Sequence, residues 1–267
     1  MNNSDVVVIT GASGGIGAAI AKRLGRDKER LVLAARRKAE LHSIAEEAKK
    51  LGAPTVLEVP TDVTNRDDVN HLRDAAIAEF GRIDVWINNA GRGISKRTLD
   101  LTEEDVDDMI KVNLKSALYG MQAVIPHFIE RGRGHVINIS SFLARVPVAS
   151  HRSVYSASKA ALNSLTANVR MDLLAKHPDV HVSLIMPGVV HTDFAVNANT
   201  PDELRIDLPG RQGAAPTQTA DEVADYVAGV MENPIAESYT NPASQDLARG
   251  YYSDVGAFEA RVVQHFR

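Results

Sequence analysis

The chain has 267 residues, of which 44% are hydrophobic and 24% are charged, as is typical of one globular α/β domain. The net charge of −4 gives no basis for a nucleic-acid surface, and the absence of cysteine excludes disulfides and thiolate metal sites. No apolar run reaches the ~18 residues that a membrane span needs. Residues 1–5 are polar and lack a signal-like apolar region, so we expect a cytoplasmic protein.

A short β-branched run at residues 6–9 predicts a buried first strand. A glycine-rich turn with Gly11, Gly14, Gly15 and Gly17 follows it, and residues 18–24 favour a helix. Such a turn suits a dinucleotide pyrophosphate, because glycines let the backbone approach phosphates and the helix start offers free N–H groups. The alternative is a tight connection that binds nothing.

The second strand is predicted at residues 31–35, and Arg36 and Arg37 follow it. Proteins that prefer NAD place an acidic residue near this point to bond the ribose 2′-hydroxyl. Two guanidinium groups suit the 2′-phosphate of NADP instead. The alternative is a solvated basic patch that opens the next helix, predicted over residues 39–50.

Two further strands are predicted at residues 55–59 and 83–87, with a helix at residues 66–80 between them. Asp62 and Val63 follow the first of these strands, and residues 88–91 (Asn-Asn-Ala-Gly) close the second. Open α/β sheets bind ligands at the carboxyl ends of their strands. The asparagine pair either caps a strand end or, with its small neighbours, lets a cofactor lie close to the backbone.

A long helix is predicted from an N-cap at Thr102 past residue 121 toward residue 128, with an acidic first turn. Asn113 lies in its interior, where asparagine is unfavourable because its side chain competes with the backbone. This residue is either exposed, or it marks a local kink that holds a water.

The fifth strand, residues 135–139, ends in Ser140 and Ser141, and Tyr155 and Lys159 follow on a predicted helix. The four-residue spacing places the phenol and the ammonium on one helix face. An ammonium favours the phenolate, so we expect Lys159 to lower the pKa of Tyr155 and let it exchange a proton with an alcohol or ketone. The alternative is a surface tyrosine beside a solvated lysine.

The rest of the chain has a sixth strand at residues 180–186, a helix at 219–231 and a seventh strand expected near 236–240. Residues 193–216 are interpreted as a variable substrate loop. Residues 241–267 form an atypical tail, a polar run and then a helix from Asp254 toward His265. Because four apolar residues recur there at helical spacing, we expect the tail to pack on the body or on a partner subunit. These residues are Val255, Phe258, Val262 and Phe266.

These motifs together resemble the short-chain dehydrogenase/reductase family in its compact single-domain branch. The resemblance covers residues 6–192, from the glycine turn to Thr192. It implies one NAD(P)-binding domain over residues 1–267, of α/β class, with a Rossmann-type doubly wound sheet of about seven parallel strands and helices on both faces.

The resemblance also implies roles for site residues. Tyr155 is the general acid/base, Ser141 bonds the substrate oxygen, and Lys159 lowers the tyrosine pKa and holds the nicotinamide ribose. Asn113 positions a water that links Lys159 to solvent. Ser141 is preferred to Ser140 because it is the third residue after Asn138.

The implied binding sets are larger. The cofactor set is Gly11, Ser13, Gly14, Gly15, Ile16, Gly17, Arg36, Arg37, Asp62, Val63, Asn89, Ala90, Gly91, Tyr155, Lys159, Pro187, Gly188, Val190 and Thr192. The substrate set is Ser141, Phe142, Tyr155, Val189 and Phe194. No metal is needed, and the nine histidines show no ligand-like cluster in the sequence.

The sequence therefore predicts an NADP(H)-preferring oxidoreductase that interconverts a ketone or aldehyde and an alcohol. The alternatives are an NAD-dependent alcohol dehydrogenase of the same family, an isomerase or dehydratase-like member, and a non-catalytic NADP-binding sensor or scaffold. A small carbonyl or alcohol substrate is expected, without nucleic acid or membrane. The tail lacks the Val-Asp-Gly-Gly-like turn that helps many relatives form tetramers. A homodimer through the long helices of Thr102 and Tyr155, or a homotetramer, is expected.

Overall fold

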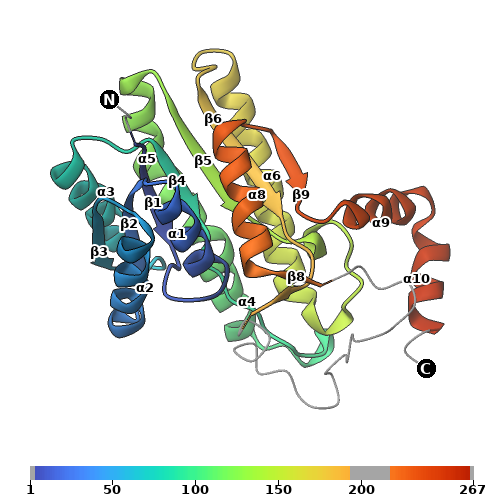
Figure 1. Ribbon diagram of the computed structural model, residues 1–267. Coiled ribbons are helices and arrows are strands. Elements are labelled where there is room, and N and C mark those ends of the chain that lie inside the picture. The colour runs from blue at the N-terminus through green and yellow to red at the C-terminus, as the bar shows by residue number, and fades with distance from the viewer. Residues whose placement is uncertain (1–3, 193–216, 265–267) are drawn as a thin grey trace.

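The computed structural model describes residues 4–192 and 217–264, and its centre is a seven-stranded parallel sheet in the order β3-β2-β1-β4-β5-β6-β9 (Figure 1). The strands are β1 (Val6–Thr10), β2 (Arg30–Ala35), β3 (Val56–Pro60), β4 (Val85–Asn88), β5 (Gly134–Ile139), β6 (Val180–Met186) and β9 (Glu237–Tyr239). The prediction of about seven parallel strands in a Rossmann-type sheet is confirmed, including the seventh strand expected near residues 236–240.

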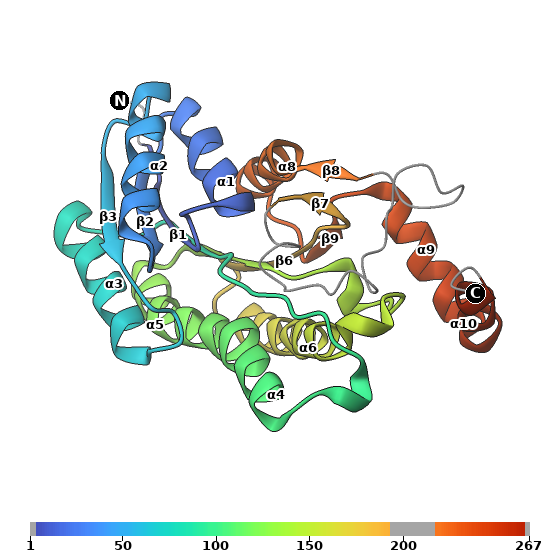
Figure 2. The ribbon, with the colours of Figure 1, turned by 90° about the horizontal axis from the view of Figure 1, so that it is seen from below.

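Helices cover both faces of the sheet, because the strands are apolar on both sides (Figure 2). Along β1, Val7 and Ile9 pack under α1, α2 and α8, while Val6 and Val8 pack on the opposite side with α3, α5 and α6. The helices are α1 (Gly15–Arg26), α2 (Lys38–Leu51), α3 (Arg66–Phe80), α4 (Glu103–Ile110), α5 (Ser116–Arg131), α6 (Ser153–Leu174) and α8 (Ala220–Glu232).

The strand order reverses between β1 and β4: β1 pairs with β2 on one side and with β4 on the other, both in parallel register. In such a sheet the connections leave this point toward opposite faces, and a crevice opens outside the carboxyl ends of the two strands. The glycine turn follows β1, and Asn89 follows β4. The fold therefore brings these two predicted motifs to the same place.

The predicted long helix from Thr102 is interrupted. A π-helical turn, η2 (Lys111–Lys115), separates α4 from α5, and Asn113 lies buried in its middle. Single π turns inside α-helices are frequent at functional sites. Of the two alternatives for Asn113, the structure has the local distortion rather than the exposed side chain.

The carboxyl-terminal tail differs from the expectation of a polar run followed by one helix. Residues of that run form α9 (Pro242–Ser253), whose N-cap Asn241 accepts a hydrogen bond from the Ala243 N–H at 3.0 Å. Proline at the first helical position fits this start, because it needs no N–H there. The expected last helix is present as α10 (Val255–Gln264).

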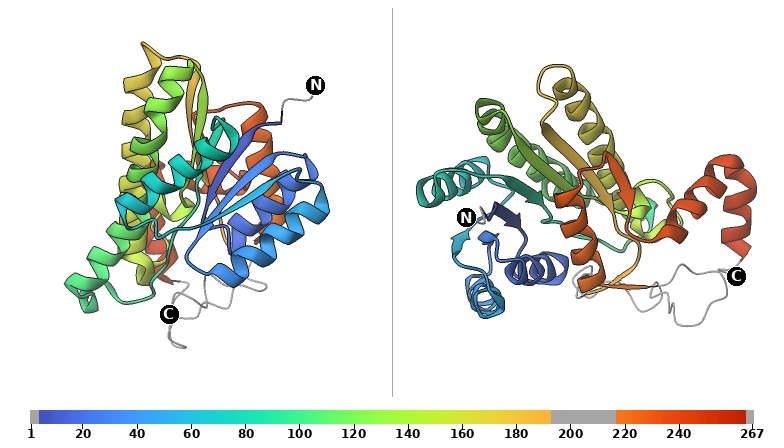
Figure 3. Two further views of the ribbon diagram at one scale, coloured as in Figure 1. Left: turned by 90° about the vertical axis from the view of Figure 1, so that its left-hand side faces the viewer. Right: turned by 45° about the horizontal axis from the view of Figure 1, so that its top comes forward.

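The tail projects to one side of the sheet (Figure 3). It packs back on the body through a small apolar cluster. Phe258 and Val262 of the expected stripe belong to this cluster, together with Phe142 and Val146 of the loop after β5. Val255 is exposed instead, and Phe266 lies outside the described residues. Phe194 and the expected loop at residues 193–216 also lie outside the part of the chain that the structure describes.

Candidate active site

The glycine turn after β1 is built so that backbone, not side chains, faces the crevice. Gly11 has φ of 68°, and a Cβ at this position would lie 2.8 Å from Ala90 Cα. A Cβ on Gly17 would lie 2.4 Å from Gly11 O, closer than atoms tolerate. Both positions therefore require glycine, the first for its left-handed backbone as well as its space.

Side chains at the ends of β1 and β4 hold this turn in place. Asn89 Nδ2 donates to Thr10 O at 2.9 Å and to Gly11 O at 3.3 Å. In return, Thr10 Oγ1 accepts the backbone N–H groups of Asn89 and Ala90, each at 3.1 Å. Asn89 therefore fixes the shape of the turn, which places Gly11 and Ala90 against each other.

The start of α1 fits a phosphate group. Gly14 is its N-cap, no side chain caps it, and no acidic residue lies in its first turn. The N–H groups and the positive end of the helix dipole are thus presented without a competing anion. Gly15, with φ of 54°, brings Thr192 to the same turn, since a Cβ there would lie 3.6 Å from Thr192 Cγ2. Ile16 packs against the core beneath the turn.

The two arginines after β2 interact with the loops that follow two different strands. The guanidinium of Arg37 is exposed, and it donates to Ser13 Oγ and to Ser13 O at 3.1 Å. Arg36 is exposed, and its charge helps to lower the pKa of Asp62. Positive charge therefore flanks the glycine turn on one side and the end of β3 on the other.

Asp62 is held ionised at the end of β3. Burial pushes its pKa upward, but hydrogen bonds from the Thr64 N–H at 2.9 Å and hydroxyl at 2.8 Å outweigh this and lower the pKa. The carboxylate is therefore turned toward its own loop, while Val63 packs on the core. The expected place of Asp62 and Val63 in the cofactor site stays a prediction.

Asn113 ties the π turn to the segment after β4. Its Nδ2 donates to Arg92 O and its Oδ1 accepts the Arg92 N–H, both at 2.9 Å. The same Nδ2 lies 3.1 Å from Ser158 Oγ on α6. A Cβ on Gly91 would meet Asn113 Oδ1 at 3.2 Å and Lys159 Nζ at 3.4 Å. Asn113 thus lies beside Lys159, and its expected role in holding a water stays a prediction.

The two serines after β5 point to different places. Ser140 Oγ donates to Asn163 Oδ1 at 2.5 Å, so it serves the packing of α6 on the sheet. Ser141 begins the short helix η3 (Phe142–Ala144), where its Oγ accepts the Leu143 N–H at 3.2 Å, and it also hydrogen-bonds the phenol of Tyr155. The geometry therefore supports the preference for Ser141 over Ser140.

Tyr155 and Lys159 are both buried on α6, as their spacing predicts, but their electrostatics differ from the expectation. Burial raises the pKa of Tyr155, against a smaller lowering by the Ser141 hydrogen bond. Burial also lowers the pKa of Lys159 to about 8, and its Nζ donates to Ile139 O at 2.8 Å. The expectation that Lys159 lowers the pKa of Tyr155 is wrong here, because desolvation dominates both groups.

The segment after β6 joins the catalytic edge to the tail. Pro187 O accepts the Phe142 N–H at 2.8 Å, and a Cβ on Gly188 would lie 3.4 Å from Ser244 Oγ of α9. Val189 is 44% exposed, so it is available to a ligand. Val190 pairs with Gln218 in a two-stranded sheet of β7 (Val190–His191) and β8 (Gln218–Thr219), which the sequence did not predict.

Three residues that the sequence analysis left out take part in the site. Thr10 holds the β4 end, Ser158 Oγ links Asn113 to the Tyr155 backbone oxygen at 2.7 Å, and Arg152 influences the pKa of Tyr155. Only Arg152 had a sequence signal, because it lies three residues before Tyr155 and seven before Lys159.

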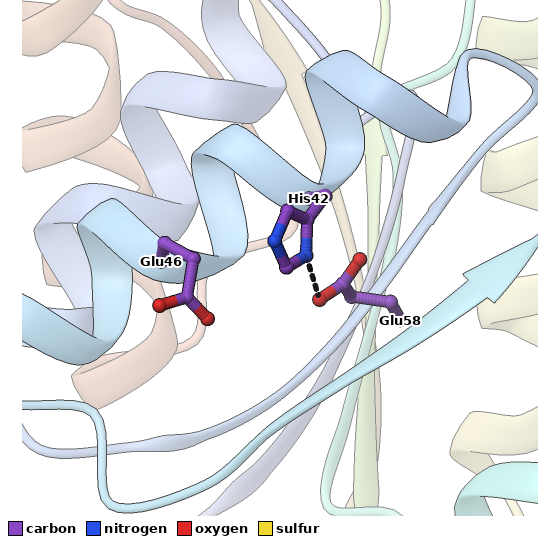
Figure 4. Close-up of side chains that lie close together, drawn as sticks. All are labelled: His42, Glu46 and Glu58. Atoms are coloured by element: carbon purple, nitrogen blue, oxygen red, sulfur yellow. Dashed lines mark hydrogen bonds and ion pairs between the residues drawn. The ribbon is translucent and has the colours of Figure 1, made fainter.

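One group of possible metal ligands occurs among the described residues, away from this edge (Figure 4). The sequence analysis saw no histidine cluster, yet His42 and Glu46 of α2 approach Glu58 of β3. His42 Nδ1 lies 3.0 Å from Glu58 Oε1, and the imidazole is largely exposed. Glu46 Oε1 already accepts a hydrogen bond from Lys49 Nζ at 2.8 Å. The His42–Glu58 hydrogen bond and the Lys49–Glu46 ion pair account for this cluster, and it shares no residue with the site.

The fold and this site define a nucleotide-binding Rossmann protein. Residues 5–203 match the short chain dehydrogenase family, and the chain belongs to that family. A protein described as an uncharacterized oxidoreductase from Staphylococcus aureus (strain MW2) is 38% identical over 202 residues, which cover 76% of this chain and 85% of that protein. The predicted family is thereby confirmed, and with it the class of oxidoreductases.

Two solved structures illustrate the likeness. The alcohol dehydrogenase from the archaeon Thermococcus sibiricus, complexed with 5-hydroxy-NADP, is 29% identical with a TM-score of 0.76, over 89% of this chain and 96% of its own. A short chain dehydrogenase/reductase from Burkholderia phymatum, in complex with NAD, is 26% identical with a TM-score of 0.84, over 95% of each chain. Among the helices that the structure describes, none is long and apolar enough to cross a membrane.

Proposed function

We propose that this protein is an NADP(H)-dependent oxidoreductase that interconverts a ketone or aldehyde and an alcohol. The observation that carries the proposal is the hydrogen bond between Ser141 and a buried Tyr155, beside a buried Lys159 and at the edge where the glycine turn lies. A hydroxyl pair of this kind can hold one carbonyl oxygen, and the chain matches the short chain dehydrogenase family and a relative described as an oxidoreductase.

The residues at the glycine turn and the strand ends would hold the dinucleotide. Its pyrophosphate would lie at the start of α1, near Gly15 and Thr192, and its nicotinamide half would lie near Gly91 and Lys159. Bound there, the nicotinamide supplies or accepts the hydride. The protein's own contribution is to orient the groups and to manage the proton.

Tyr155 is the proton donor for carbonyl reduction. Because burial raises the pKa of its phenol, the side chain stays protonated at neutral pH and has a proton to give. Ser141 Oγ stabilises the developing negative charge on the substrate oxygen through a second hydrogen bond. In the oxidative direction the same two hydroxyls hold the alcohol, and the proton returns to Tyr155.

The preference for NADP follows from charge at the end of β2. Ala35 stands at the strand end, where an acid would repel a 2′-phosphate, and Arg36 and Arg37 follow it. Arg37 is already oriented by Ser13, which places its guanidinium beside the turn. Similar structures bind both kinds of cofactor, 5-hydroxy-NADP in one case and NAD in another, so the preference rests on these residues.

We further propose a cytoplasmic homodimer or homotetramer. Met171 and Leu174 on α6 are 61% and 67% exposed. Large apolar side chains on one long helix are suited to burial between subunits. The interface would then include the helix that carries Tyr155.

The test is NADPH oxidation by the purified protein against a panel of ketones and aldehydes, with Tyr155→Phe as the control. We expect carbonyl-dependent oxidation that the variant loses by about 10²–10⁴-fold while it still binds the dinucleotide, because only the proton donor is removed. Near-normal turnover in the variant contradicts the mechanism. Dinucleotide binding without any turnover indicates a sensor. Substrate conversion without net NADPH consumption indicates an isomerase. A preference for NADH over NADPH indicates the NAD-dependent alternative.

A further inference from the structure

The segment that leaves β6, residues 187–192, joins the glycine turn to the tail. At one end of it lies Thr192, since a Cβ on Gly15 at the start of α1 would lie 3.6 Å from Thr192 Cγ2. Near the other end, a Cβ on Gly188 would lie 3.4 Å from the Oγ of Ser244, a residue of α9 that is 1% exposed. One short stretch of backbone therefore meets both the place proposed for the pyrophosphate and the first turn of α9.

Gln218 holds the middle of this segment through its backbone. The Gln218 N–H donates to Val189 O at 2.8 Å, and Gln218 pairs with Val190 in the small sheet of β7 and β8. Figure 2 shows these two strands between α8 and the start of α9. The backbone of β8 is fixed in turn, because the next residue, Thr219, forms a capping box with Glu222 at the start of α8.

Helix α8 is itself anchored to the helix that follows the glycine turn. Val223 of α8 and Ile20 of α1 belong to the same buried cluster. In addition, Arg23 Nε of α1 donates to Asp225 Oδ1 of α8 at 2.6 Å. The position of Gln218 is therefore fixed relative to α1, whose start is the proposed phosphate site.

The side chain of Gln218 extends to the residue that precedes the tail. Gln218 Oε1 accepts a hydrogen bond from Thr240 Oγ1 at 2.5 Å, and Gln218 Nε2 donates to Thr240 O at 3.2 Å. Thr240 is buried, and its N–H donates to Met186 O at 3.3 Å, at the end of β6. An amide that donates to and accepts from one residue is held in a single orientation. Gln218 thus links the end of β6, the segment after it and the start of the tail.

We propose that Gln218 is a positioning residue for the dinucleotide, which holds residues 189–192 against the glycine turn and joins them to Thr240. This inference rests on the proposed function, since it takes the start of α1 as the place of the pyrophosphate. A segment that is already held in place binds a ligand more tightly, because less freedom is lost on binding. Gln218 acts through the backbone of this segment and needs no contact with the ligand.

The experiment measures equilibrium binding of the dinucleotide and of its adenosine part to wild type and to Gln218→Met. The dinucleotide is NADP⁺ or NAD⁺, whichever the wild type binds more tightly, and the matching fragment is adenosine 2′-phosphate or adenosine. Methionine keeps the length of the side chain and removes both of its hydrogen bonds. We expect dinucleotide binding to weaken about five- to twentyfold. Fragment binding should change less than about twofold, because the fragment lacks the pyrophosphate and the nicotinamide.

Steady-state kinetics with a carbonyl substrate give a second readout. The KM for the dinucleotide should rise by the same factor in Gln218→Met, while kcat at saturating dinucleotide is kept, because Ser141 and Tyr155 are untouched. The matched control is Gln245→Met, which removes the same amide from an exposed side chain of α9. The control should change neither the dissociation constants nor the kinetics.

A double-mutant cycle tests the link to the tail. Thr240→Val removes the hydroxyl that donates to Gln218 and keeps the shape of the side chain. The double variant should bind the dinucleotide no more weakly than Gln218→Met alone, because the contact is already absent. Additive losses would show that the two residues act separately and would overturn the link.

The outcomes separate this inference from the proposed function. Unchanged dinucleotide binding in Gln218→Met, or an equal loss for dinucleotide and fragment, overturns the positioning role. Dinucleotide binding that depends on Gln218 without reduction of any carbonyl supports the positioning role and contradicts the proposed function. A wild type that binds neither dinucleotide overturns both.

Discussion

The proposed active site has a cofactor side and a substrate side, and the two are built from different parts of the chain. The cofactor side uses backbone: Gly11 and Gly17 are required for space, and α1 presents free N–H groups. The substrate side uses side chains, chiefly Ser141 and Tyr155, supported by an apolar cluster shared with the tail. Backbone geometry suits a ligand common to a whole family, whereas side chains can change with the substrate. Each side should therefore be separable by mutation, except where one residue serves both.

Lys159 is the residue that should break this separation. Its buried Nζ reaches Ile139 O at 2.8 Å on the substrate side and lies near Gly91 on the cofactor side. We expect Lys159→Ala to lower turnover by about 10²–10⁴-fold and also to weaken dinucleotide binding, because one charge serves both. Steady-state kinetics and dinucleotide titration of the same preparation measure the two effects. A loss of turnover with unchanged affinity would place Lys159 on the substrate side alone.

A substitution at Arg36 should affect the cofactor side alone. A hydrogen bond to a charged group contributes about 1.5–3 kcal/mol, so Arg36→Ala should weaken NADP binding by roughly tenfold to over a hundredfold. NAD binding should hardly change, since NAD lacks the 2′-phosphate. The dissociation constants of both cofactors are compared at one salt concentration, because the contact is ionic.

A companion variant sharpens the assignment. Ala35→Asp combined with Arg36→Ala places a carboxylate at the strand end, where NAD-binding proteins bond the ribose hydroxyls. Its preference should shift toward NAD. Equal losses for both cofactors in Arg36→Ala would mean that the arginine only shapes the pocket, and a wild type that prefers NAD would refute the interpretation of β2.

The cofactor side was also the more predictable from sequence. Parallel strands buried on both faces are continuous β-branched runs, so residues 6–9 and their successors predicted the sheet directly. The glycine turn and the Tyr155–Lys159 spacing carry local signals. Arg37 does not, because its hydrogen bonds to Ser13 depend on how the ends of β1 and β2 meet.

Other features were missed because tertiary contacts decide them. The π turn at Asn113 depends on the backbone of Arg92, which is 21 residues earlier in the chain. The pKa of Tyr155 depends on burial and on the direction in which Lys159 points, so the spacing alone gave the wrong sign. The start of α9 at Asn241 and Pro242 fits a turn as well as a helix N-cap.

A substitution at Phe258 should affect the substrate side and leave dinucleotide binding unchanged. This residue of α10 is buried with Phe142 and Val146, and its ring lies edge-on to Tyr251 at 5.4 Å between centroids. We expect Phe258→Ala to cost about 2–4 kcal/mol, near the lower end for buried phenylalanines because α10 is peripheral. The melting temperature should fall, and kcat/KM should drop several-fold through the Ser141 loop while dinucleotide affinity is kept.

The matched control is Val263→Ala, because Val263 of α10 is 52% exposed and should change neither quantity. Removal of all residues after Ser253 should reproduce the effect of Phe258→Ala or change the oligomer mass. An unaltered melting temperature and an unaltered mass together would show that the tail contributes nothing to the body.

Glu29 lies just before β2, at the opposite end of the strands from the proposed active site. A substitution there should affect stability alone. Burial and the nearby charge of Asp5 raise the pKa of its carboxyl to about 7, although the Asp5 N–H donates to it. The folded state therefore binds more protons than the unfolded state between pH ~4.5 and ~7, and this contribution to stability is lost as pH rises through that window. Glu29→Gln keeps an acceptor for the N–H and removes the charge. The variant should gain about 1 kcal/mol in free energy of unfolding over wild type at pH 8, after allowance for solvent screening, and the gain should vanish below pH ~4.5.

Denaturant unfolding across pH measures the difference, with Glu79→Gln on the exposed side of α3 as the control. A gain that does not vary with pH would assign the effect to packing, and any change in turnover would contradict the separation of this edge from the active site.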